Sequence, residues 1–132
     1  MVKEAQRQII SRITSAQNFY TLLHEYTSKE KEYFLLLTLD AASKVIEKCV
    51  IHIGTLHHFV HPREIFKPAI TNAAEGIIIS HNHPRRTLEA SRADIQIMQR
   101  LKDVDKLVGI GLLDHVIISS NGYYSFSNEG LL

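Results

Sequence analysis

The chain has 132 residues, which at roughly 150 residues per domain predicts a single domain over 1–132. Hydrophobic residues make up 45% of the sequence and charged residues 22%, which is close to the composition of ordinary globular proteins. This composition argues against a disordered, collagen-like or coiled-coil protein. Fifteen Lys and Arg against fourteen Asp and Glu leave a net charge of +1. Strong nucleic-acid binding is therefore not expected, because such proteins need an excess of positive charge.

No apolar run approaches the roughly 20 residues that cross a bilayer, and the first residues lack the apolar stretch of a signal peptide. We expect no membrane partner and a cytoplasmic location. The single cysteine, Cys49, cannot form an internal disulfide, which agrees with a reducing compartment. Residues 1–13 are expected to pack loosely, and the sequence leaves a homo-oligomer open.

The first half of the chain predicts a helix followed by strands. Thr14 and Ser15 precede an amphipathic pattern that indicates a capped helix ending near 27–28. Residues 32–39 form a continuous apolar run, typical of a strand buried on both faces, with 44–53 as its antiparallel partner. A short edge strand is expected over 55–60.

The second half alternates helices and strands. The predicted elements are a helix from His61-Pro62 to about Asn72, a core strand over 76–80, a long helix over 91–108 capped by Ser91, a strand over 112–118, a turn at Asn121-Gly122 and a last strand over 123–126. Mixed strands with two principal helices on the sheet indicate an α/β or α+β sandwich.

Six of the eight histidines lie between His52 and His83, and two of them have a spacing that suits a metal. His81 and His83 are two residues apart, so in an extended segment their side chains share one face. Asp94 lies in the first turn of the next predicted helix, where a loop can return its carboxylate to the two rings. Two imidazole nitrogens and one carboxylate oxygen leave a fourth tetrahedral position, typical of a catalytic zinc site that lowers the pKa of water to near ~7.

An ordinary structural interpretation of the same residues stays open. Ser91 and Asp94 also match a helix capping box, and two histidines before a proline are compatible with a turn. Ser91 can serve both as a cap and as a site residue.

These residues resemble a known family. His81-x-His83 followed by Ser91 and Asp94, with a glutamate upstream, resembles the JAMM motif of JAB/MPN metalloproteases, and the RadC family is the closer match. The resemblance extends over 15–132 through these segments: Glu32 to Asp40, Gly54-Thr55, His61 to Phe66, His81-Asn82-His83-Pro84, Leu112 to His115, Ser125-Phe126 and Gly130 to Leu132.

The resemblance implies a JAB/MPN, cytidine-deaminase-like sandwich, with a curved mixed sheet flanked by helices. It further implies Zn²⁺ on His81, His83 and Asp94, Ser91 polarising the substrate carbonyl, and Glu32 as general base. Arg85-Arg86-Thr87 replaces the Ser-Gly-Asp type of turn usual in the family, so the loop and its substrate contacts are expected to differ. We expect no helix-hairpin-helix region of the kind that many members carry, so a DNA role inferred from that region is not expected to transfer.

Several other residues have two interpretations. Glu30 is the alternative to Glu32 as general base, because we expect both side chains on one strand face. An ordinary solvent-exposed acidic residue is the other interpretation of each. Asp114-His115 is compatible with a residue that orients a ligand imidazole, but a hydrogen-bonded core histidine is favoured.

Two further clusters of side chains also have two interpretations. His52, His57, His58 and His61 suggest a second metal site, but His61 as a helix cap and the others as surface residues are favoured. Arg85, Arg86 and Arg92 are compatible with docking an acidic or phosphate ligand, although such clusters are more often solvated.

The sequence therefore predicts a zinc metallohydrolase that cleaves the peptide or isopeptide bonds of an unidentified protein or peptide substrate. The alternative is a non-catalytic metal-binding or DNA-repair-associated interaction module. A nuclease of the His-Asn-His class is disfavoured, because that class needs a ββα metal finger, whereas this segment joins a strand to a long helix.

Overall fold

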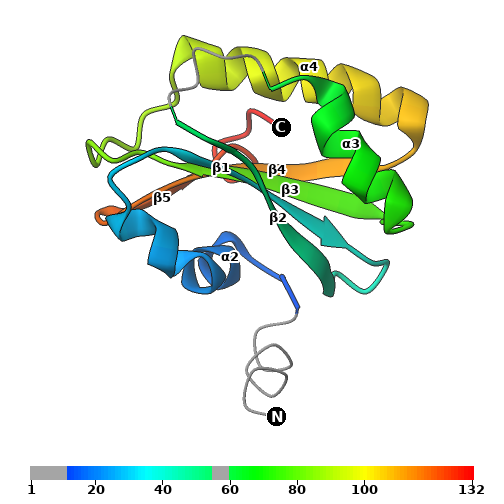
Figure 1. Ribbon diagram of the computed structural model, residues 1–132, viewed down its shortest axis with the longest axis horizontal. Coiled ribbons are helices and arrows are strands. Elements are labelled where there is room, and N and C mark those ends of the chain that lie inside the picture. Colours follow the sequence, from blue (N-terminus) through cyan, green and yellow to red (C-terminus); the bar gives the residue numbers. More distant parts are fainter. Residues whose placement is uncertain (1–11, 55–59) are drawn as a thin grey trace.

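A computed structural model describes residues 12–54 and 60–132 as five strands in one sheet with helices on both faces (Figure 1). The helices are α2 (Ala16–Leu22), the 3-10 helix η1 (His24–Ser28), α3 (Pro62–Thr71) and α4 (Arg92–Val108). The strands are β1 (Tyr33–Leu39), β2 (Val45–Ile53), β3 (Gly76–Asn82), β4 (Gly111–Ser119) and β5 (Gly122–Ser125). The α+β prediction is confirmed.

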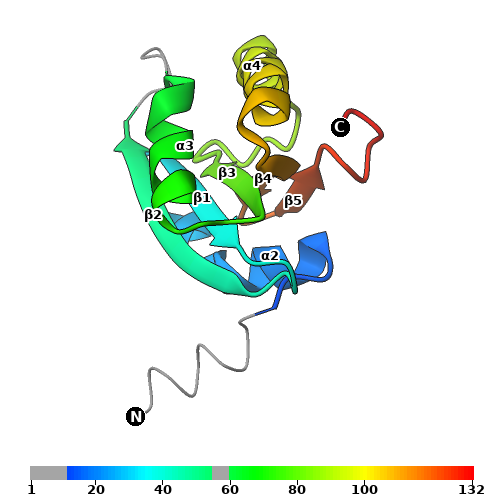
Figure 2. The same ribbon diagram turned by 90° about the vertical axis from the view of Figure 1, so that its right-hand side faces the viewer.

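The sheet order is β2-β1-β3-β4-β5, in which β3 and β4 are parallel and the other pairs antiparallel. Helix α4 connects the two parallel strands, as a parallel pair requires a crossover. Helices α3 and α4 lie together on one face and α2 lies on the opposite face (Figure 2).

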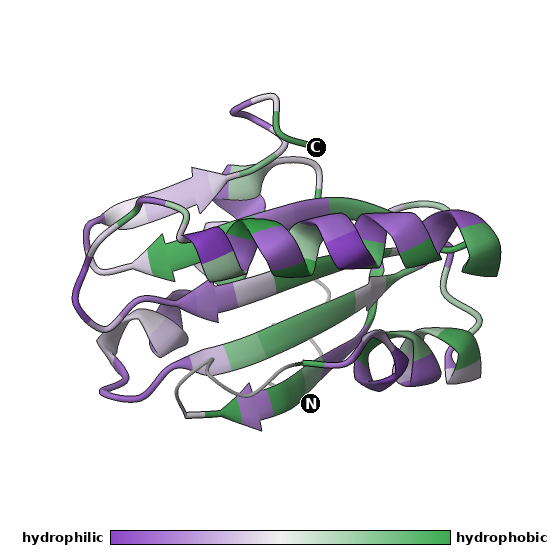
Figure 3. Cartoon of the chain, turned by 90° about the horizontal axis from the view of Figure 1, so that it is seen from above, coloured by the Kyte–Doolittle hydropathy of each residue, from purple (hydrophilic) through white to green (hydrophobic). Residues whose placement is uncertain are grey.

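Strand β1, which lies between β2 and β3 in the sheet, is buried on both faces, as its apolar run predicted. Leu36 packs in the cluster under α3 and α4, whereas Leu35 and Leu37 pack in the cluster that contains α2. All three are fully buried, and each such side chain contributes about 1.5–3 kcal/mol. Figure 3 shows the apolar strands under the mixed polar and apolar surface of α4.

The first helix is shorter than predicted. A single helix to 27–28 was expected, but α2 ends at Leu22 and the tighter η1 follows. Side-chain hydroxyls compete for backbone carbonyls here, since Thr27 Oγ1 bonds His24 O at 2.6 Å. In a 3-10 helix, positions three apart share a face, and Leu23 and Tyr26 are both buried.

The caps of α3 and α4 follow the sequence closely. His61 caps α3, because its Nδ1 accepts from Arg63 N at 3.1 Å and Glu64 bonds back to His61 N. Ser91 caps α4, and Gly109 ends it with a left-handed φ of 78° that favours glycine. The interpretation of His61 as a helix cap is confirmed.

Other boundaries differ modestly from prediction. Strand β3 continues two residues beyond 76–80, so His81 and Asn82 belong to the sheet. Of the expected edge strand 55–60, residues 55–59 lie outside the described residues, and Val60 is buried without belonging to a strand. Of residues 1–13, only Arg12 and Ile13 are described, and Ile13 N bonds Ser43 O at 2.9 Å.

Within the described part of the chain, none of the helices has the length and apolar character needed to cross a membrane.

Asp105 provides a test of how α4 is fixed to the sheet. This buried carboxylate accepts from Leu112 N at 2.9 Å at the start of β4 and from Lys102 Nζ at 3.2 Å. We expect Asp105→Ala to lower the free energy of unfolding by about 1–3 kcal/mol, because the buried Leu112 N–H loses its acceptor. Urea denaturation measures the change.

The control for this prediction is Asp103→Ala, an exposed position on the same helix, which should change stability by no more than about 0.5 kcal/mol. Equal effects of the two substitutions would contradict the assigned role of Asp105.

Candidate metal centre

Three side chains converge where β3 ends and α4 begins. His81 Nε2 lies 2.9 Å from His83 Nε2 and 2.9 Å from Asp94 Oδ1, and His83 Nε2 lies 3.5 Å from Asp94 Oδ2. One donor atom from each residue lies within 4.8 Å of the others. Among residues 12–54 and 60–132, this is the group of histidine, cysteine and acidic side chains arranged to hold a metal ion.

The donor set fits a divalent transition metal such as zinc. His81 and Asp94 are almost completely buried, and Asp94 Oδ1 receives no hydrogen bond although it is in ion-pair contact with His81. A buried carboxylate oxygen without a donor is unfavourable unless a cation completes its environment. Two imidazole nitrogens and a carboxylate are also the ligand types of catalytic zinc sites.

The ring nitrogens that face away from the convergence point have partners. His83 Nδ1 lies 2.9 Å from the carbonyl oxygen of Thr87, which can only accept, so this nitrogen carries the proton. His81 Nδ1 lies 3.1 Å from Nε2 of His115. With its proton on Nδ1, His83 presents the lone pair of Nε2 to a metal, the arrangement usual for metal-ligating histidines.

The electrostatics keep Asp94 ionised. Burial alone would raise the pKa of Asp94, but its contacts with His81 and His83 outweigh that effect and hold the pKa well below its usual range. For His83, burial lowers the pKa, whereas the contact with Asp94 raises it and prevails.

Ser91 is part of the site by virtue of its role as a helix cap. Its Oγ accepts from Asp94 N at 3.1 Å, and Asp94 Oδ2 accepts from Ser91 N at 2.8 Å. The hydroxyl still has its proton to donate, since capping uses only an oxygen lone pair. Ser91 is exposed and lines the pocket beside the candidate ligands. The two sequence interpretations of Ser91 are therefore compatible.

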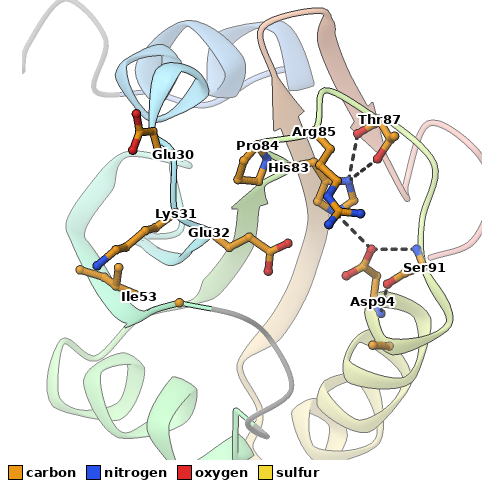
Figure 4. Close-up of a pocket in the computed structure, with 12 residues that line it drawn as sticks. Glu30, Lys31, Glu32, Ile53, His83, Pro84, Arg85, Thr87, Ser91 and Asp94 are labelled. Atoms are coloured by element: carbon orange, nitrogen blue, oxygen red, sulfur yellow. Dashed lines mark hydrogen bonds and ion pairs between the residues drawn. The ribbon is translucent and has the colours of Figure 1, made fainter.

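A pocket of about 820 Å³ opens over His83, Ser91 and Asp94. Glu32 lies on its opposite wall and points toward His83 and Asp94, whereas Glu30 points away (Figure 4). Glu32 is close enough for its charge to contribute to the raised pKa of His83. The expectation that Glu30 shares a strand face with Glu32 is wrong, because β1 begins only at Tyr33 and Glu30 lies in a bend.

Asn82 is a residue of the site that sequence reasoning missed. Its side chain is fully buried, accepts from Tyr33 N at 2.6 Å and donates to Lys31 O at 2.9 Å. These two backbone groups flank Glu32, so Asn82 ties the candidate base to the strand that carries His81. The signal in the sequence that could have identified Asn82 is its position between the two candidate ligands His81 and His83.

His115 agrees in part with both interpretations of the Asp114-His115 pair. It is fully buried in β4, as expected of a core histidine, yet its Nε2 contacts the ring of His81. Burial, with a smaller effect of His81, lowers its pKa well below the usual value, so the ring is neutral.

The arginines and the remaining histidines show no second centre in the described chain. Arg85, Arg86 and Arg92 are exposed, and of the three only Arg85 lines the pocket. His52 belongs to β2, whereas His57 and His58 lie outside the described residues.

The fold and the two-histidine, one-aspartate centre define a JAB-type domain. The family described as the RadC-like JAB domain matches residues 13–131, and the chain belongs to this family. The resemblance seen in the sequence is therefore confirmed.

The chain is similar to curated UPF0758 proteins. It is 40% identical over 125 residues to one from Geotalea uraniireducens, covering 93% of this chain and 55% of that protein. It is 37% identical over 123 residues to one from Geobacter sulfurreducens and 39% identical over 123 residues to one from Methanococcoides burtonii, in each case covering 92% of this chain and 54% of the relative. The chain thus spans about half the length of these relatives.

The centre predicts a metal stoichiometry that can be measured. Purified protein should bind about one zinc ion per chain, and Asp94→Ala should weaken binding at least about 100-fold, because two imidazoles alone hold zinc poorly. Competition with a chromophoric chelator measures the affinity. Glu89→Ala, an exposed acid in the loop that precedes α4, is the control and should bind zinc like the wild type. Equal binding by folded Asp94→Ala would contradict the assignment.

Proposed function

We propose that this chain is a zinc-dependent metallohydrolase that cleaves amide bonds in peptide or isopeptide linkage. The observation that carries the proposal is the convergence of His81, His83 and Asp94 opposite the carboxylate of Glu32 across one pocket. Zinc held by these three side chains would supply a Lewis acid that polarises the amide carbonyl and makes water acidic enough to attack at neutral pH.

Glu32 is the group that moves the proton. Its carboxylate takes a proton from the attacking water as the water oxygen bonds to the carbonyl carbon. It returns that proton to the leaving nitrogen when the carbon–nitrogen bond breaks, which yields a carboxylic acid and an amine. The backbone on both sides of Glu32 is bonded to Asn82, and Glu32 O accepts from Gly54 N at 2.8 Å. This fixed backbone supports its role as a positioned base.

Ser91 stabilises the charge that develops on the carbonyl oxygen. Its hydroxyl proton is free to donate, while its oxygen is held at the start of α4 by Asp94 N. A donor fixed before the reaction begins needs no reorganisation as the negative charge develops. The N-terminal end of α4 adds a favourable dipole at the same place.

The alternative function is a non-catalytic metal-binding or DNA-repair-associated interaction module. The near-zero net charge supports a protein or peptide partner over a nucleic acid, and we propose weak, non-specific DNA binding at most. We also propose a cytoplasmic location, supported by the single, unpaired Cys49.

Exchanging Glu32 for its amide separates metal binding from catalysis. Glu32→Gln should bind zinc like the wild type, because Glu32 is not among the three convergent residues. Its rate of amide hydrolysis should fall by about 10²–10⁴, because the amide cannot accept the proton of water. Mass spectrometry of a peptide and isopeptide library identifies a cleaved substrate, and the rate on that substrate is then measured.

Glu30→Gln is the matched control, since Glu30 lines the same pocket but points away from His83 and Asp94, and it should retain the wild-type rate. A folded, zinc-loaded Glu32→Gln protein with full activity would remove Glu32 from the mechanism. If the zinc-loaded wild type cleaves no library member, the non-catalytic module takes the place of this proposal.

A further inference from the structure

A second histidine lies directly behind the candidate ligand His81. His115 is fully buried, and its Nε2 lies 3.1 Å from Nδ1 of His81. Strand pairing sets this contact, because His115 is the register partner of Ile79 and Ile117 that of His81 in the parallel pair β3 and β4. The two rings are thus neighbours on the face of the sheet covered by α4.

The contact restricts where the protons can be when a metal is bound. A histidine that ligates through Nε2 must carry its proton on Nδ1, and a buried N–H needs an acceptor. For His81 that acceptor is the Nε2 lone pair of His115. If His115 carried a proton on Nε2, two N–H groups would face each other at 3.1 Å. His115 must therefore carry its own proton on Nδ1.

The other nitrogen of His115 shows that this arrangement has a cost. Its Nδ1 is buried and has no hydrogen-bond partner. An apolar residue at this position would avoid the cost of burying a polar nitrogen without a partner. We take the contact with His81 to be the favourable interaction that offsets this cost. Unlike a carboxylate in the same place, a neutral imidazole accepts the proton without adding negative charge behind the metal ligands.

The chain holds the His115 ring in place from several sides. Phe126 stacks on it, with ring centroids 4.4 Å apart and planes 13° from parallel, and Phe126 N bonds His115 O at 3.0 Å. Asp114 accepts from His115 N at 2.8 Å and from Ser127 N at 2.9 Å. The end of the chain therefore closes over this ring and fixes its orientation.

We propose that His115 is a positioning residue that accepts the Nδ1 proton of His81 and thereby selects Nε2 of His81 as the metal ligand. The inference rests on the proposed function only in taking zinc as the metal. His115 itself is not one of the three convergent residues.

The test compares two substitutions at one position. His115→Phe keeps an aromatic ring to stack on Phe126 but removes the acceptor, and zinc affinity should fall about 10–100-fold. His115→Gln restores an acceptor oxygen and should regain most of that loss. Ile117→Val, a neighbouring core change without a polar atom, should bind zinc like the wild type. Affinities come from chelator competition on proteins that retain the wild-type circular dichroism spectrum.

Nuclear magnetic resonance of the zinc-loaded wild type gives a second, mutation-free measurement. Long-range proton–nitrogen correlations should place the ring protons of both His81 and His115 on Nδ1. A proton on Nε2 of His115, or unchanged zinc affinity in folded His115→Phe, overturns the inference. If the affinity and tautomer results are as expected but no amide is cleaved, only the proposed function fails. A wild type that binds no zinc overturns both.

Discussion

The carboxylate of Asp94 is held against two imidazole rings in a place almost closed to water, and the rest of the site is arranged around it. A buried charge is unfavourable unless it is paired and hydrogen-bonded. One oxygen meets that condition through Ser91 N and the N-terminal end of α4, which makes the carboxylate part of the helix cap. The other oxygen has no donor and faces the point where the rings converge.

Each of the three convergent side chains has one polar atom that is fixed by the chain and another that is left for a ligand. Thr87 O fixes Nδ1 of His83, and His115 faces Nδ1 of His81. Thr87 belongs to the loop that departs from the usual family pattern. The shorter contact comes from a backbone carbonyl, and the hydroxyl of Thr87 lies 3.3 Å from the same nitrogen. Any residue has a backbone carbonyl, so the loop can change its sequence and keep the shorter contact to His83.

Local features of the site could be predicted from the sequence, whereas features that depend on strand pairing could not. The cap formed by Ser91 and Asp94 and the shared face of His81 and His83 each involve neighbours in the chain. The contact of His115 with His81 depends on the register of two parallel strands, which no local pattern contains. The early end of α2 was missed because Thr27 and its neighbours compete for backbone carbonyls.

His81 and Asn82 at the end of β3, with His83 directly after them, bring the candidate metal ligands and the candidate base together because of the geometry of an extended segment. Alternate side chains point to opposite faces, so His81 and His83 share one face and Asn82 points to the other. From there Asn82 reaches the backbone on both sides of Glu32. The register of β1 on β3, with Phe34 opposite His81, then sets where Glu32 lies relative to the two rings. A slip of that pairing by one residue would turn the side chains of β1 over relative to those of β3 and separate Tyr33 N from Asn82 in the same step. The relative position of the candidate ligands and the candidate base therefore depends on a single strand register.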